Sequence, residues 1–172
     1  MDLYFLAKFL HIAVAILWLG SAAGMVISGG RAIRAGNNGD VMVIVRHTKF
    51  LAETIFLPGS VAMLALGLYM TWTTWSFGDA WVVIGILGVV ATGAIGGGIL
   101  TPLVKKIDAI GPGAEAYAMG RDLLRKARAD MVLLFVIVWD MVAKPSWSDW
   151  LEILVMAAVV ALGGLLFLRK SA

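Results

Sequence analysis

Apolar residues form five long segments in this chain, separated by shorter polar stretches. The segments cover residues 4–28, 50–72, 80–104, 129–143 and 151–168. A helix needs about 20 apolar residues to cross the hydrocarbon layer of a bilayer, and four of the segments come close to that length. The fourth is the shortest and would need residues from its basic flank to cross. The pattern predicts an all-α, polytopic membrane bundle that forms one domain with five transmembrane helices.

The polar stretches also carry helical signals. Residues 40–49 are expected to extend the second helix beyond the membrane, and residues 114–128 to extend the fourth after a turn at residues 110–113. Pro58 lies inside the second segment. Because proline lacks a backbone N–H and clashes with the preceding turn, we expect a kink there.

Small residues recur every four positions on three of the segments, which indicates how the helices meet. These ladders are Gly20, Gly24 and Ser28, then Gly88, Thr92 and Gly96, then Ala157 and Ala161. Such ladders let helix backbones approach closely in lipid. In the glycine-rich third segment, close packing is one interpretation. Room for a flat tetrapyrrole or quinone is the other, because glycine lets a ligand approach the backbone.

Composition agrees with the membrane class. Of the 172 residues, 61% are hydrophobic and only 15% are charged, which is too apolar for a soluble domain of this length. The chain has no cysteine, and this excludes disulfides, iron–sulfur clusters and thiolate metal sites. A signal peptide begins with a basic region that is followed by an apolar one. Here the first residues carry Asp2 and no basic region, and Lys8 interrupts the apolar part, so we expect the first segment to be retained.

The distribution of positive charge predicts the orientation. Twelve of the fourteen lysines and arginines lie between the first two segments, between the third and fourth, or after the fifth; the exceptions are Lys8 and Lys144. By the positive-inside rule that side is cytoplasmic, so the N-terminus is expected outside and the C-terminus inside. The opposite side carries Trp72, Trp75, Trp81, Trp147 and Trp150. The net charge of +3 therefore indicates topology and contact with anionic lipids, not nucleic-acid binding.

Two ionisable residues interrupt the first apolar segment. Offsets of three, four and seven return to one face of a helix, so Lys8, His11 and Trp18 share a stripe. Ionisable groups at membrane depth are costly and indicate a functional site. A histidine hydrogen-bonded to a neighbouring helix would be a structural explanation. A ligand for a metal or haem would be a functional one.

Further polar residues are expected at both ends of the bundle. Asp140 lies one turn before Lys144, and the two can pair; Lys8 or His11 lies at a depth where it could also reach Asp140. At the cytoplasmic end, Glu53 with Arg46 or Lys49 would offer a proton or propionate site, and His47 is expected at the interface.

The only two histidines, His11 and His47, are expected near opposite membrane faces. One chain therefore cannot ligate a haem through both, because about 30 Å of hydrocarbon separates them. A haem on His11 would need Lys8, Lys144 or Met141 as its second ligand, or an open position. Three ligands for a catalytic zinc do not cluster, and copper could use His11 with methionine.

Three short motifs resemble a known family. The runs at residues 8–11 and 18–20, residues 47–53 with Pro58, and residues 141–145 are similar to the HemJ-type protoporphyrinogen oxidase of bacteria. The third segment, with Pro102 and a basic pair after it, resembles instead an uncharacterised family of predicted bacterial integral membrane proteins. That family is distantly akin to the CopD copper-resistance domain. The resemblance covers about residues 4–145.

The resemblance implies a four-helix bundle whose first-helix histidine, here His11, ligates haem b, with the fifth helix an addition. The oxidase carries a lysine after a tryptophan on its third helix, proposed as the second ligand. Here Trp81 is followed by Val82, and no lysine occurs before Lys105.

Three functions follow from these observations. The first is a redox-associated membrane protein that holds haem b through His11, supported by Trp18, Lys8 and Lys144. The second is a non-enzymatic structural or accessory subunit, in a homo-oligomer or a larger membrane complex, whose polar residues lock helices together. The third, a copper or small-solute permease, ranks last because the polar residues lie at the two ends and leave the middle apolar.

Overall fold

The computed structural model describes residues 2–168, and every regular element in that range is a helix. The elements are α1 (Leu3–Arg34), α2 (Asn38–Leu51), α3 (Leu57–Thr74), α4 (Ala80–Ile95), α5 (Thr101–Ile110), α6 (Ala114–Ala143) and α7 (Trp150–Leu168), with π-helical segments η1 (Ala52–Phe56) and η2 (Gly96–Leu100). The prediction of an all-α fold is confirmed. So are the expected helical extensions at residues 40–49 and 114–128 and the turn between α5 and α6.

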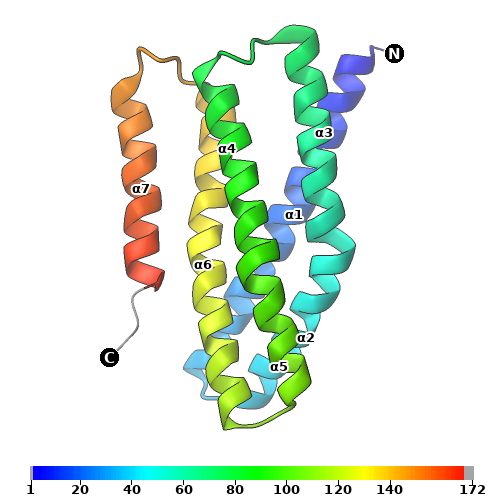
Figure 1. The fold of residues 1–172 in the computed structure, drawn as a ribbon, viewed down its shortest axis with the longest axis vertical. Helices are drawn as coiled ribbons and strands as arrows, with labels where there is room; N and C mark the ends of the chain where they lie inside the picture. The colour runs from blue at the N-terminus through cyan, green and yellow to red at the C-terminus, as the bar shows by residue number, and fades with distance from the viewer. Residues whose placement is uncertain (1, 169–172) are drawn as a thin grey trace.

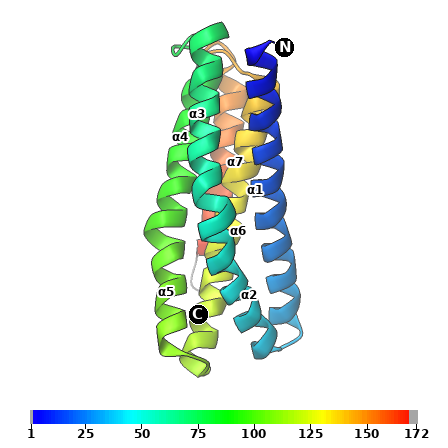
Figure 2. The same ribbon diagram turned by 90° about the vertical axis from the view of Figure 1, so that its right-hand side faces the viewer.

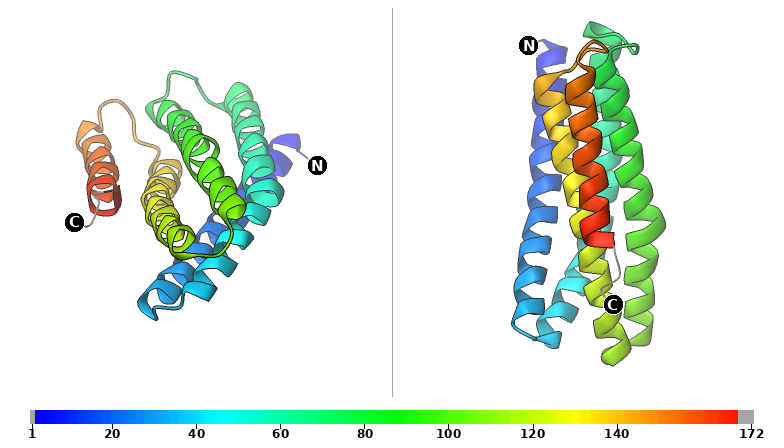
Figure 3. Two further views of the ribbon diagram at one scale, coloured as in Figure 1. Left: turned by 60° about the horizontal axis from the view of Figure 1, so that its bottom comes forward. Right: turned by 90° about the vertical axis from the view of Figure 1, so that its left-hand side faces the viewer.

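Long helices lying side by side build the bundle (Figures 1 and 2). α2, η1 and α3 run on as one helix, as do α4, η2 and α5. α1, α3, α4 and α6 pack together as a core, whereas α7 packs mainly on α6 (Figures 1 and 3). The arrangement is a four-helix core plus one additional C-terminal helix.

Within residues 2–168, four helices are long and apolar enough to cross a membrane: Leu3–Arg34, Asn38–Thr74, Ala80–Ile110 and Trp150–Leu168. α6 is not among them, because charged residues such as Arg128, Asp130 and Asp140 accompany its apolar part. α6 nevertheless lies between α4 and α7 in the bundle (Figure 1). The crossing by the fourth apolar segment stays a prediction.

The two ends of the bundle differ in chemistry. We call the end where α3 meets α4 and α6 meets α7 the aromatic end, because Trp72, Trp75, Trp81, Trp147 and Trp150 lie there. The indole N–H of Trp147 donates a 2.9 Å hydrogen bond to the Gly78 carbonyl, which joins the two loops. The other end, formed by the end of α1 with α2, α5 and the start of α6, is called the basic end; Figure 2 shows α2 and α5 together there.

Proline explains both π-helical segments. Pro58 and Pro102 each lie at the second residue of an α-helix, directly after η1 and η2. Proline has no N–H to bond the carbonyl four residues earlier, and its ring clashes with that carbonyl. The helical turn before the proline therefore widens. The kink predicted at Pro58 is found as this local distortion, and Pro102 produces a second one.

The glycines of α4 have two different environments. A Cβ on Gly88 would lie 2.6 Å from Cγ1 of Ile137, and one on Gly85 would overlap the terminal methyl of Met141. Both glycines therefore allow α6 to approach α4 closely. A Cβ on Gly93 would meet no atom of the described residues within 4 Å.

The loop between α6 and α7 depends on Asp149. Its carboxylate accepts a 2.8 Å hydrogen bond from the Ser146 backbone N–H and a 2.6 Å bond from the Ser146 hydroxyl. These bonds hold the pKa of Asp149 below its ordinary value. The stabilisation is therefore complete above the ordinary pKa and is lost as the pH falls through the lowered one. We expect Asp149→Ala to speed hydrogen exchange of the loop amides at pH 7; unchanged exchange would contradict this role.

A candidate cofactor cavity at the aromatic end

A cavity of about 200 Å³ lies between α1, α3, α4 and α6 at the aromatic end. Its walls are mostly apolar, and its polar side chains gather at one place. The lining residues that matter below are Tyr4, Lys8, His11, Met63, Gly67, Thr71, Trp75, Trp81, Gly85, Met141 and Lys144. Lys8 and Lys144 are exposed, so the cavity opens at the surface of the bundle.

His11 lies in the wall contributed by α1. Its Nδ1 is buried and has no hydrogen-bond partner among residues 2–168. The ring lies against α3, where a Cβ added to Gly67 would be 3.4 Å from Cε1 of the imidazole. A buried nitrogen without a partner is uncommon in folded proteins. The Met63 backbone on α3 also lies within hydrogen-bonding reach of the imidazole, so the ring is held against a neighbouring helix while Nδ1 lacks a well-formed hydrogen bond.

Lys144 lies over two aromatic rings at the mouth of the cavity. Its Nζ is 3.8 Å from the ring centroid of Trp75 and 4.9 Å from that of Trp81. The two indoles pack edge to face, with centroids 5.1 Å apart. Cations over aromatic faces are attracted by the ring quadrupole. The aromatic pair thus positions an ammonium group beside the cavity.

The expected pair between Asp140 and Lys144 is not formed. Lys144 ends α6 in a left-handed conformation with φ of 50°, which turns its side chain away from the helix and toward the indoles. Asp140 is fully buried, and neither of its carboxylate oxygens has a hydrogen-bond partner within the described chain. The alternative contacts of Asp140 with Lys8 or His11 are likewise not formed within the described chain.

Asp140 instead faces α4 just behind the cavity wall. A Cβ on Gly85 would lie 3.4 Å from Oδ2 of Asp140. The next residue, Met141, lines the cavity and covers Gly85. On the side of α7, the indole N–H of Trp139 donates a 2.9 Å hydrogen bond to Glu152.

Sequence reasoning missed a second acidic residue inside the bundle. The hydroxyl of Thr92 on α4 donates a 2.6 Å hydrogen bond to Oδ1 of Asp130 on α6. Asp130 ends a stretch in which acids and bases alternate, and that pattern is typical of a solvated helix face. The sequence signal that could have found this contact is the ladder of Gly88, Thr92 and Gly96, because such a ladder marks a helix face that packs on another helix.

The other predicted site residues lie away from this cavity. Trp18 is buried in the core beside Met63 and Leu134 and does not line the cavity. Four residues belong to the basic end: Arg46 and Lys49 line a different cavity there, and His47 and Glu53 are exposed. In the described part of the chain, no three His, Cys, Asp or Glu side chains are grouped to hold a metal ion.

Comparison with known families assigns the chain. Residues 5–145 match the family described as predicted integral membrane protein (DUF2269). The chain belongs to this family. The matched region contains the four-helix core of this DUF2269 protein and nearly all of the cavity lining, and it ends before α7 begins. No curated protein and no solved structure is significantly similar to the chain.

Proposed function

We propose that the protein crosses a bacterial inner membrane five times, with the aromatic end outside and the basic end in the cytoplasm. Four apolar helices of sufficient length among residues 2–168 support this topology, and α6 packs alongside α1, α4 and α7. The separation of tryptophan from lysine and arginine along the bundle supports its direction. Anionic lipid headgroups would then contact the basic end.

We further propose that the cavity at the aromatic end holds haem b, with His11 as an iron ligand. The observation that carries the proposal is the imidazole of His11 in a cavity wall, with a buried Nδ1 that makes no well-formed hydrogen bond within the described chain. The Met63 backbone lies within reach of the ring and would hold it in position. Histidine and methionine are established axial ligands of haem iron. Met141, Lys8 and Lys144 line the same cavity and are the candidates for the second position.

The donor set of the cavity fits this cofactor, and its size constrains how the cofactor would sit. A lysine at the mouth, Lys8 or Lys144, that does not ligate the iron would as an ammonium group neutralise a carboxylate of a porphyrin. The indoles of Trp75 and Trp81 would exclude water. The volume of about 200 Å³ is below the roughly 300 Å³ of the smallest typical ligand pockets, so a porphyrin would extend outside it.

When bound, haem would supply one-electron transfer, and the chain would supply orientation and charge. His11 would hold the iron, and the buried carboxyl of Asp140 could hold a proton behind the wall. The first-helix motif supports kinship with the HemJ-type oxidase. The lysine proposed as the second haem ligand in that oxidase is missing after Trp81, so we do not extend the proposal to porphyrinogen oxidation.

An absorbance spectrum tests the cofactor proposal. We expect the full chain, purified in mild detergent from haem-replete cells, to show a Soret band that His11→Ala abolishes. His47→Ala is the matched control, because His47 is exposed at the other end of the bundle, and it should keep the band. If the wild-type chain lacks the band even after haem is added, the proposal is wrong.

A structural or accessory role is the second candidate, and the contact between Thr92 and Asp130 favours it. That hydrogen bond locks α4 to α6 without any ligand. Gly20 and Gly24 meet no other described atom within 4 Å where a Cβ would be, so their ladder is available to a helix of a second subunit. In this case His11→Ala would lower thermal stability and leave the spectrum unchanged.

A further inference from the structure

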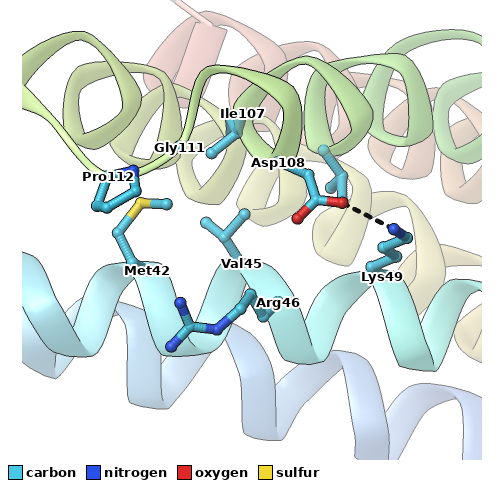
Figure 4. A pocket seen from close by; sticks show the side chains of 9 residues that line it. Met42, Val45, Arg46, Lys49, Ile107, Asp108, Gly111 and Pro112 are labelled. Carbon is cyan, nitrogen blue, oxygen red and sulfur yellow. Dashed lines mark hydrogen bonds and ion pairs between the residues drawn. The ribbon is translucent and has the colours of Figure 1, made fainter.

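A second cavity, of about 120 Å³, lies at the basic end between α2 and α5 (Figure 4). The side chains that line it come from both helices and from the turn that follows α5. They are Met42, Val45, Arg46, Lys49, Val104, Ile107, Asp108, Gly111 and Pro112. The sequence contains the basic residues of this end but gives no sign of a cavity between them.

The cavity has an apolar floor and an ionised rim. Val45 and Ile107 are almost fully buried, with 2% and 0% of their surface exposed. On the rim, Nζ of Lys49 lies 2.7 Å from Oδ2 of Asp108. Figure 4 shows these two side chains reaching toward each other, so the ion pair ties α2 to α5 beside the cavity.

Arg46 is the remaining cation of the rim. It is exposed and forms no ion pair or hydrogen bond with any residue from 2 to 168. In Figure 4 its side chain runs along α2, with the guanidinium directed away from Asp108 and Lys49, so it would have to turn toward Lys49 to share a phosphate with it. The three ionised side chains sum to one positive charge, which a single phosphodiester would balance.

We propose that this cavity binds the headgroup phosphate of an anionic phospholipid, held by Arg46 and Lys49. A guanidinium can donate two parallel hydrogen bonds to a phosphate. Basic pockets between helices at the cytoplasmic side of membrane proteins recognise such headgroups. The apolar floor suits the glycerol and first acyl carbons, which free phosphate lacks. The proposal rests on the membrane topology given above and is independent of haem.

Lipid binding to the detergent-purified full chain tests the site. We expect native mass spectrometry to show phosphatidylglycerol binding in preference to phosphatidylcholine. Arg46→Ala should weaken this binding about tenfold, because a hydrogen bond to a charged group contributes about 1.5 kcal/mol or more. Arg121→Ala is the matched control, since Arg121 is an exposed arginine of α6 that does not line the cavity. It should bind the lipid like wild type.

Three outcomes would overturn the proposal. The first is equal binding of the two lipids, and the second is equal weakening by Arg46→Ala and Arg121→Ala, which would show a general charge effect. The third is inorganic phosphate occupying the site with no competition from phosphatidylglycerol, which would identify a free anion as the ligand. If the alanine variant does not fold, Arg46→Gln removes the charge while keeping the first three side-chain carbons and a polar end group. The Soret band should be unaffected in every variant, so failure here is distinct from failure of the haem proposal.

Discussion

Gly88→Leu is expected to destabilise the bundle by about 3 kcal/mol, the upper part of the range for inserting extra carbons into a packed interior. Gly88 is buried on α4, and even a Cβ there would lie 2.6 Å from Cγ1 and 2.9 Å from Cδ1 of Ile137. Ile137 is itself buried in the core, so it cannot move aside freely. α4 and α6 would have to separate, and they would lose the contacts between their apolar side chains.

Gly93→Leu on the same helix is the matched control. Gly93 is exposed, and a Cβ there would meet nothing within 4 Å among the described residues. Because leucine favours helix by almost 1 kcal/mol over glycine, this variant should be as stable as wild type or slightly more stable. Thermal unfolding in detergent, followed by the loss of the monodisperse elution peak, measures both. Equal midpoints for Gly88→Leu and Gly93→Leu would contradict the packing of α4 on α6.

Asp140→Asn is expected to stabilise the protein by about 1–3 kcal/mol at about pH 9, where the buried carboxyl has lost its proton, and by less at lower pH, where a buried carboxyl stays protonated. An ionised carboxylate that is buried without a partner has lost its hydration and gained no hydrogen bond. Asp140 is fully buried, and neither oxygen is paired in the part of the chain that the structure describes. The amide of asparagine keeps the shape and removes the charge.

Asp130→Asn serves as the comparison, because Asp130 lies on the same helix and already accepts a hydrogen bond from Thr92. Asparagine retains an acceptor oxygen there, so we expect a change in stability smaller than about 1 kcal/mol. Thermal midpoints of the two variants, measured in the same detergent, check the difference. If Asp140→Asn is less stable than wild type, the carboxylate has a stabilising partner and this interpretation fails.

If Asp140 lowers the stability of the bundle, its presence is explained by function and not by packing. Asp140 is adjacent to the cavity through Gly85 and Met141. Ionisable groups inside a membrane bundle usually belong to a ligand or proton site. A stabilised Asp140→Asn variant with an altered cofactor spectrum would connect the carboxyl to the cavity at the aromatic end. A stabilised variant with a wild-type spectrum would separate the two.

The sequence by itself determined the elements of this protein. Runs of apolar residues with few charges have one stable arrangement in lipid, because every backbone N–H and C=O must be satisfied within a helix. The same local signals located the turn at residues 110–113 and the distortion before Pro58. The stripe of Lys8 and His11 also followed from helical spacing, and both residues line one cavity.

Tertiary structure alone decided which side chains meet. The spacing of four residues that suggested a pair of Asp140 with Lys144 was overridden by the left-handed end of α6, which directs the lysine to Trp75 and Trp81. The many glycines of the third segment could not show by themselves that Gly88 is packed and Gly93 is open. Such contacts depend on the rotation and separation of neighbouring helices. Those quantities come from the sum of many packing interactions between distant segments, and no local pattern encodes them.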